Sequence, residues 1–98
     1  MGSFLYKIHR RSEQTLLAIC DASLKGKTLT DSIEIIVDAD FYGTEACTDD
    51  TVLALAREAT MINALGNDVV SLFQKGGLVD KDATIVIAGV KHAQIYSL

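Results

Sequence analysis

The residues with the clearest chemical potential lie near the end of the chain, where a histidine and a carboxamide stand two positions apart. His92 and Gln94 follow an apolar run, Ala83 to Ala88, and a glycine at position 89. An imidazole titrates near neutral pH and serves as acid, base or ligand, while a carboxamide both donates and accepts hydrogen bonds. Because functional groups often stand where a core strand ends, we expect a site here.

Side chains of the acidic segment between residues 38 and 50 could complete a catalytic group with His92. Asp40 or Tyr42 would orient the imidazole, and Cys47 would act as nucleophile if the fold brings it close. The alternative is a histidine that only satisfies backbone groups at a strand bend. We take the non-catalytic alternative as the working hypothesis, with His92 as the candidate acid or base of its rival.

Two further candidates have a structural and a functional interpretation. Phe41 and Tyr42 either form an exposed anchor for a partner or plug the space under a sheet, and burial of aromatic rings in small domains favours the plug. The hydroxyl of Tyr42 could still reach His92. Asn63 falls on the apolar stripe of an expected helix, where it bonds a facing loop or ends the helix.

Alternating and aliphatic runs predict two hairpins in the first part of the chain. The run from Phe4 to His9 alternates in polarity, and a turn at residues 11–14 joins it to the aliphatic run from Thr15 to Cys20. A short strand at residues 28–30 and a second at residues 33–37 flank a turn at Asp31. We therefore expect both hairpins to precede the helices.

Helical spacing follows the acidic segment. Thr48 or Asp49 is expected to cap a helix whose apolar stripe reaches residue 62 and which ends at Gly66. Asn67 is expected to cap a second helix that ends at the glycines of positions 76 and 77. A turn at residues 80–82 then leads to a core strand at residues 83–88, and a last short strand is possible at residues 95–96.

These elements predict an α+β fold in one domain over residues 1–98. Two N-terminal hairpins, two short helices packed on one face of a sheet and C-terminal strands that return to the sheet account for the whole pattern. A chain of this size buries enough apolar surface to fold without a metal or a disulfide. We accordingly expect no cofactor and no metal site.

Charge is distributed unevenly along the chain. The net charge of −4 divides into +3 over residues 1–27 and −7 over the remainder. An acidic body argues against general coating of nucleic acid, but the basic N-terminal part could touch a phosphate backbone locally. The alternative is ordinary solubilising charge. The candidate nucleic-acid contacts are Lys7, Arg10, Arg11, Lys25 and Lys27.

Other signatures fail on inspection. The stretch from Asp21 to Thr28 resembles the end of a phosphate-binding loop, but a carboxylate stands where the first glycine belongs and no long helix follows. Cys20 and Cys47 lack partners at metal-ligand spacing. No membrane-length apolar run and no secretory segment is visible, so we expect a cytoplasmic protein with reduced thiols and no membrane partner.

Four motifs in order carry a family resemblance. They are Asp40-Phe41-Tyr42-Gly43, Arg57-Glu58-Ala59-Thr60 with Asn63 and Gly66, Gly77-Leu78-Val79, and Gly89-Val90 with His92-Ala93-Gln94. In order and spacing the chain resembles archaeal domain-of-unknown-function family 424 over nearly its whole length. The resemblance implies a small cytoplasmic archaeal protein with a suspected role near translation or RNA. Lys91 departs from the family pattern, which has proline there, and is expected to add positive charge beside His92.

Together these features favour a non-catalytic module that contacts RNA or a ribonucleoprotein partner. Its expected binding surface lies beside the basic hairpin. The rivals are a small enzyme that uses His92 as general acid or base, and a homo-oligomeric structural subunit that exposes an apolar patch. The residues expected to form the binding surface are Asp40, Phe41, Tyr42, Asn63, His92 and Gln94.

Overall fold

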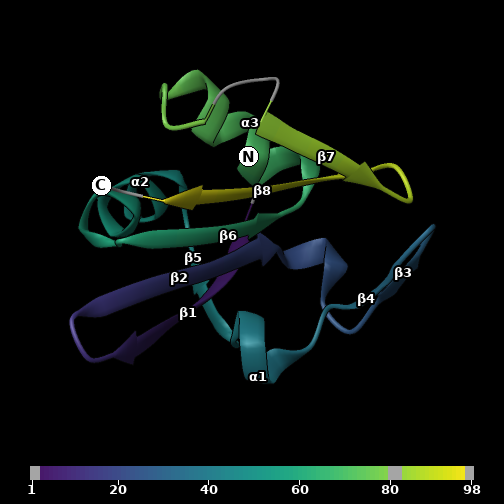
Figure 1. The fold of residues 1–98 in the computed structure, drawn as a ribbon, viewed down its shortest axis with the longest axis horizontal. Helices are drawn as coiled ribbons and strands as arrows, with labels where there is room; N and C mark the ends of the chain where they lie inside the picture. Colours follow the sequence, from purple (N-terminus) through teal and green to yellow (C-terminus); the bar gives the residue numbers. More distant parts are fainter. Residues whose placement is uncertain (1–2, 80–82, 97–98) are drawn as a thin grey trace.

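Six strands form one mixed sheet, and two more form a separate hairpin, in a computed structural model that describes residues 3–79 and 83–96 (Figure 1). The sheet order is β5-β1-β2-β6-β8-β7, and its central pair, β2 with β6, is parallel while the other pairs are antiparallel. In chain order the elements are β1 (Phe4–Arg11), β2 (Gln14–Asp21), the 3-10 turn η1 (Ala22–Leu24), β3 (Thr28–Thr30), β4 (Glu34–Ile36), α1 (Ala39–Tyr42), β5 (Glu45–Cys47), α2 (Asp49–Glu58), β6 (Met61–Leu65), α3 (Asn67–Lys75), β7 (Thr84–Ile87) and β8 (Val90–Tyr96).

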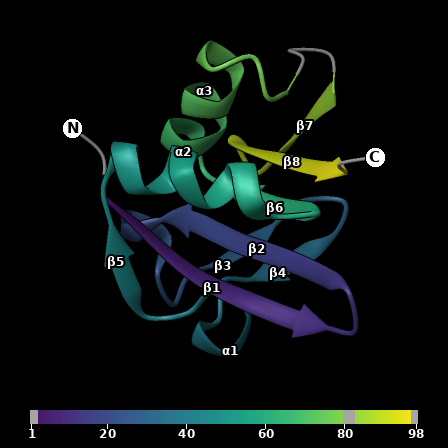
Figure 2. The same ribbon diagram turned by 90° about the vertical axis from the view of Figure 1, so that its left-hand side faces the viewer.

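The sheet has two covered faces of different character. Helices α2 and α3 pack on one face over a core of aliphatic side chains and Phe73, whereas α1 and the β3–β4 hairpin lie on the other (Figure 2). Both predicted hairpins are present, β1 with β2 and β3 with β4. The predicted α+β class, with helices on one sheet face and C-terminal strands returning to the sheet, is confirmed.

The predicted helix ending at Gly66 is wrong in its second half. Helix α2 begins after Thr48 as expected, but it ends at Glu58, and residues 61–65 form the central strand β6. Four of the five residues of β6 are apolar, and Ile62 falls at helical spacing from the apolar residues of α2, so the stripe continued into the strand without a break in the pattern. Thr60 marks the change: its amide and hydroxyl both donate to the carbonyl of Thr15 on β2, at 2.9 and 3.0 Å.

The assignment of the C-terminal strands also needs correction. The run at residues 83–88 was predicted as a core strand, but β7 is the sheet edge and leaves Ile85 and Val86 more than half exposed. The strand beside β6 is β8, which is seven residues long and contains His92 and Gln94 within it. The predicted turn at residues 80–82 lies outside the described residues.

The acidic segment is more structured than the loop predicted for it. Residues 39–42 form the short helix α1, and residues 45–47 form the edge strand β5 beside β1. Asp38 caps α1, since its carboxylate accepts the amide of Phe41 at 3.0 Å. At Gly43 the backbone has φ +84°, and a Cβ atom there would overlap the backbone of Tyr6 on β1, so only glycine lets α1 approach the sheet.

Helix α3 begins in a different way from the prediction that Asn67 caps it. Gly66 is the capping position, and the buried carboxylate of Asp21 at the end of β2 accepts the amides of Asp68 and Val69 at 3.0 and 2.9 Å. Asn67 instead ties the helix to the β7–β8 turn, because its carboxamide bonds the Gly89 carbonyl and the Lys91 amide. The helix then ends at the predicted glycines.

No helix in the described part of the chain is long and apolar enough to cross a membrane. The longest, α2, has ten residues. The finding agrees with the lack of a membrane-length apolar run in the sequence.

Candidate functional site

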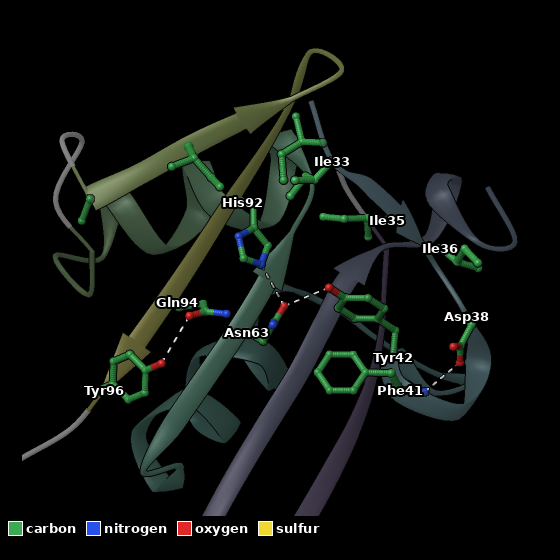
Figure 3. A pocket seen from close by; sticks show the side chains of 13 residues that line it. Ile33, Ile35, Ile36, Asp38, Phe41, Tyr42, Asn63, His92, Gln94 and Tyr96 are labelled. Atoms are coloured by element: carbon green, nitrogen blue, oxygen red, sulfur yellow. Dashed lines mark hydrogen bonds between the residues drawn. The ribbon is translucent and has the colours of Figure 1, made fainter. Parts of the chain in front are cut away.

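An open groove of about 780 Å³ lies on the sheet face opposite helices α2 and α3 (Figure 3). Strands β6, β7 and β8 form its floor, and α1 and the β3–β4 hairpin form its walls. We call it the main groove. The lining residues are Ile33, Ile35, Ile36, Asp38, Phe41, Tyr42, Asn63, Ala83, Ile85, Ile87, His92, Gln94 and Tyr96.

Strand register places the polar groups of the floor together. Asn63 on β6 stands opposite Gln94 on β8, and His92 stands two residues earlier on β8, opposite Leu65. Because side chains two residues apart point to the same face of a sheet, all three polar groups face the groove. Register therefore joins residues that the sequence separates by about thirty positions.

The carboxamide oxygen of Asn63 links helix α1 to strand β8. The hydroxyl of Tyr42, from α1, donates to Asn63 Oδ1 at 2.8 Å, and His92 Nε2 lies 3.3 Å from the same atom. Since Oδ1 can only accept, the imidazole nitrogen that faces it carries the proton and donates. The other nitrogen, Nδ1, keeps its lone pair and has no partner among the described residues.

Burial sets the protonation state of this cluster. It lowers the pKa of His92 below the ordinary value of 6.5, since desolvation disfavours the charged imidazolium. It also raises the pKa of Tyr42, so the phenol keeps its proton and remains a donor. At neutral pH the groove floor thus holds a neutral imidazole, a phenol and two carboxamides, with no formal charge.

The walls of the main groove are unusually apolar for an exposed surface. Ile33, Ile36, Ile85 and Tyr96 are 52–65% exposed and all line the groove. The hydroxyl of Tyr96 donates to Gln94 Oε1 at 3.2 Å, which leaves the amide nitrogen of Gln94 as its unused donor. A contiguous apolar surface of this kind, with a few polar groups at its centre, is typical of a ligand site.

The β3–β4 hairpin is held over the sheet at its tip. The carboxylate of Asp31 accepts the amide of Ala88, in the β7–β8 turn, at 2.9 Å. Figure 1 shows the hairpin tip beside that turn. Hydrogen bonds from the amides of Ala88 and Ser32 lower the pKa of Asp31, so the carboxylate stays ionised and the groove keeps this wall.

Helix α1 is held against the sheet by aromatic contacts. The ring of Phe41 stacks on His9 with centroids 5.2 Å apart, and it meets Tyr42 edge-on at 4.8 Å. His9 Nε2 also lies 2.8 Å from the Phe41 carbonyl oxygen. Tyr42 is buried and Phe41 half-buried, so the favoured interpretation of this pair as a plug agrees with their positions.

The main groove continues past Phe41 toward the β1–β2 turn. A second hollow of about 430 Å³ shares Phe41 with the main groove, and a smaller one of about 150 Å³ between them is lined by Asn63, Gln94, Tyr96 and Met61. We call the second hollow the arginine end. Its lining residues are His9, Arg10, Arg11, Gln14, Leu16, Phe41 and Met61.

The structure separates the basic residues predicted to contact nucleic acid. Arg10 and Arg11 lie at the arginine end, whereas Lys25 and Lys27 follow the opposite end of β2, roughly 23 Å away at the rise of a strand. Lys7 lies between them and donates from Nζ to the carbonyl of Asp40 at 2.9 Å. Lys91 lies on the helix side, where its Nζ reaches Ser71, so it adds no charge beside His92.

Two predicted partners of His92 do not reach it. Asp40 is exposed on α1 and does not line the main groove; Asn63 contacts the imidazole instead, and Tyr42 acts through Asn63. Cys47 lies on β5, four strand spacings or about 19 Å from β8, and packs on the helix face. Burial raises its pKa to about 11, so the thiol is protonated and unreactive at neutral pH.

Several lining residues were missed from the sequence. Asp38, the hairpin isoleucines, Ile85 and Tyr96 carry no local signal, because an exposed isoleucine in a strand looks the same in sequence as a buried one. Among the described residues, no three His, Cys, Asp or Glu side chains gather as a metal ion would need. The groove is lined by hydrogen-bonding groups and apolar side chains.

Comparison with known proteins finds relatives of undetermined function. A family model described as "Protein of unknown function (DUF424)" matches residues 9–98. A crystal structure of an uncharacterized conserved protein from Methanopyrus kandleri is similar, with a TM-score of 0.85 and 29% sequence identity over 99% of this chain and 93% of that one. No curated protein matches. These relatives share the fold and leave the use of the groove to be argued from its geometry.

Proposed function

This chain belongs to the DUF424 family, as its motifs predicted. From the geometry of its groove, we propose that it is a non-catalytic module that binds single-stranded RNA. One observation carries the proposal: the main groove, with aromatic rings and carboxamides, runs on into the arginine end. Modules that bind single strands combine surfaces on which bases stack with cations that follow the backbone.

The main groove suits unstacked bases. Tyr96 offers a ring that is 65% exposed at one end of the groove, and the hairpin isoleucines lie across the groove from it (Figure 3). The carboxamides of Asn63 and Gln94 lie at the floor, where they can form hydrogen bonds with the edge of a base. Base stacking and hydrogen bonding to the base edge can therefore occur on the same face of the sheet.

The charges along the groove indicate where the backbone of a bound RNA strand would lie. Arg10 and Arg11 make no ion pair or hydrogen bond with any residue in the described part of the chain, so both guanidinium groups are available to phosphates. Asp38 lines the main groove and would repel a phosphate there. The backbone is thus expected at the arginine end, about 13 Å along β2 from the floor at Asn63, with a base in the main groove.

The net charge of −4 limits the contact to a short segment. Two arginine-phosphate contacts predict that the logarithm of affinity falls with the logarithm of salt concentration with a slope of about −1.4. A protein that coats nucleic acid would give a much steeper slope. The proposal is therefore a weak, local contact that depends on stacking as much as on charge.

Fluorescence anisotropy of a labelled single-stranded RNA, measured from about 50 to 200 mM salt, tests the proposal. We expect salt-sensitive binding by the unaltered protein and a slope near zero for the Arg10→Ala/Arg11→Ala variant. Lys25→Ala/Lys27→Ala is the matched control, since it removes the same charge far from the arginine end and should leave the slope unchanged. Absence of salt-sensitive binding, or equal effects of the two variants, would overturn the proposal.

General-base chemistry is a second candidate, because the hydrogen bond to Asn63 leaves Nδ1 of a neutral imidazole free in the groove. A base in that state can accept a proton at neutral pH. A His92→Ala variant that folds normally and still binds RNA, yet loses turnover of an RNA phosphodiester, would favour this candidate. Equal and undetectable turnover by both proteins would dismiss it.

The oligomeric alternative predicts an exposed apolar patch. Such a patch exists, but of the five large hydrophobic side chains exposed in the described part of the chain, four line the main groove, and Val86 is the exception. A ligand in the groove would cover the same surface that a second copy would. Mass measured by light scattering, over a range of protein concentrations with and without RNA, separates these outcomes.

A further inference from the structure

Hydrogen bonds inside the groove engage both carboxamide oxygens of its floor, with two donors on Asn63 and one on Gln94. Asn63 Oδ1 accepts from both Tyr42 and His92, and Gln94 Oε1 accepts from Tyr96. The amide nitrogens of Asn63 and Gln94 have no partner among the described residues. Two carboxamides that could each donate and accept are thereby fixed with their donors free.

These two donors stand side by side. Asn63 and Gln94 are a cross-strand pair, and Figure 3 shows their side chains next to each other on the floor of the main groove. Directly opposed residues on neighbouring strands hold their Cβ atoms about 5 Å apart. Such spacing suits two acceptors on one edge of a planar ring.

Resting on the RNA binding proposed above, we propose that the floor of the main groove selects a base that presents two adjacent acceptors. Guanine offers O6 and N7 on its outer edge, and cytosine offers O2 and N3 on its pairing edge. Adenine places an amino group beside N7 and N1, and uracil places an N–H between its two carbonyls. In adenine the amino group, and in uracil the N–H, would face an amide nitrogen of the floor, which is also a donor.

The free Nδ1 of His92 adds an acceptor near these donors. It lies on the same face of β8 as Gln94, two residues away. A donor next to the acceptor pair, such as the amino group of cytosine or the N1–H of guanine, would meet it. A mismatched base leaves buried polar groups unpaired, which is what makes hydrogen-bonding sites selective.

The test places one variable nucleotide in the middle of an otherwise uniform uridine oligonucleotide and measures affinity by fluorescence anisotropy. We expect cytosine or guanine at that position to bind about tenfold more tightly than adenine or uridine, the discrimination of one good bidentate contact. If no oligonucleotide binds, the proposed RNA binding itself fails. If all four bind equally, or adenine binds most tightly, RNA binding stands and base selection is wrong.

Two variants connect the selectivity to the floor. Tyr96→Phe keeps the ring but frees Gln94 Oε1, so the carboxamide can turn and accept, and the tenfold preference should fall to about twofold or less. Gln94→Glu replaces a donor with acceptors and should abolish the preference. Gln74→Glu on α3, on the opposite side of the sheet, adds the same charge and should keep it. Unchanged preference in both floor variants would overturn the inference.

Discussion

Asn63 determines the chemistry of the groove, because its single carboxamide oxygen fixes a phenol from α1 and an imidazole from β8 at once. The consequence is a neutral His92 of known tautomer and a carboxamide that can only donate. The specificity of the site therefore rests on a residue that the sequence pattern assigned to the stripe of a helix.

Removing the phenolic hydroxyl tests this arrangement. Tyr42→Phe leaves Asn63 Oδ1 with one donor instead of two, and we expect the free energy of unfolding to fall by about 1 kcal/mol. Urea unfolding monitored by circular dichroism measures it. Tyr96→Phe is the matched control: its hydroxyl is exposed, so its effect should stay within about 0.5 kcal/mol. Equal losses in the two variants would contradict the account.

Protonation of His92 should couple to stability. Its folded pKa lies below the unfolded value of 6.5, so the unfolded chain takes up a proton first as the pH falls. The stability that neutral His92 contributes is present above pH 6.5 and is lost as the pH falls through the folded pKa. Asp21 acts in the opposite sense, since burial raises its pKa.

The comparison that isolates His92 is therefore the difference between the unaltered protein and His92→Gln. We expect the unfolding free energies of the two to converge or cross as the pH falls from 7 to 5, with the unaltered protein losing more. Chemical denaturation at each pH measures this difference. A difference independent of pH would show that the imidazole titrates alike in both states.

At the scale of elements, two contacts position the groove. The carboxylate of Asp21 joins the end of β2 to the start of α3, and that of Asp31 joins the β3–β4 hairpin to the β7–β8 turn. The first contact is buried and the second is exposed. We therefore expect the first to control global stability and the second to control local opening of the groove.

A substitution at Gly66 tests the buried contact between Asp21 and the start of α3. It has φ +136°, and a Cβ atom there would overlap the carboxylate of Asp21. Gly66→Ala should cost about 3 kcal/mol, from backbone strain and displaced hydrogen bonds. Gly77→Ala, with φ +75° and open space around it, should cost only about 1 kcal/mol. Thermal unfolding of both variants measures the contrast, and similar losses would refute this role for Asp21.

The exposed contact is tested locally. Asp31→Ala removes the acceptor of the Ala88 amide, so this amide should exchange its hydrogen with solvent faster while the amides of the central strands stay protected. Glu34→Gln on the same hairpin is the control and should leave the exchange of Ala88 unchanged. Hydrogen exchange followed by NMR distinguishes the two. Unchanged exchange at Ala88 in the Asp31 variant would mean that the hairpin is held by other contacts.

Elements with a local signal were predictable from the sequence. Alternation showed both hairpins, and Thr48 and the paired glycines marked the start of α2 and the end of α3. The switch from α2 to β6 carried no such signal, since the apolar residues of this central strand fall at the spacing of a helix stripe. Its position depends on pairing with β2, a contact across more than forty residues.

The same distinction applies to the site. Tyr42, Asn63, His92 and Gln94 were identified by residue type, but their convergence comes from strand register. Asp40 was predicted as a site residue, but Asp38, the cap of α1, lines the groove instead, and no local pattern shows which of these carboxylates does so. The apolar walls were missed because exposure is a property of the assembled fold.

At the scale of the whole molecule, the two faces of the sheet differ in how far they are covered. Helices α2 and α3 cover the larger core on one face, while the other face is covered by α1 and the β3–β4 hairpin and keeps an apolar groove open. The net charge is −4, yet Arg10 and Arg11, which pair with no residue in the described part of the chain, lie at one end of that groove. The shape and the charge of this face together support a short, local contact with a single strand.

Mapping the RNA contact by NMR is the most direct test of this account. The account predicts that adding single-stranded RNA at low salt shifts the side-chain signals of Asn63, Gln94 and His92 together with the backbone signals of Arg10 and Arg11. The signals of α2 and α3 should stay in place. Shifts confined to the helices or to the lysines after β2, or no shifts at all, would contradict the claim that the groove binds RNA.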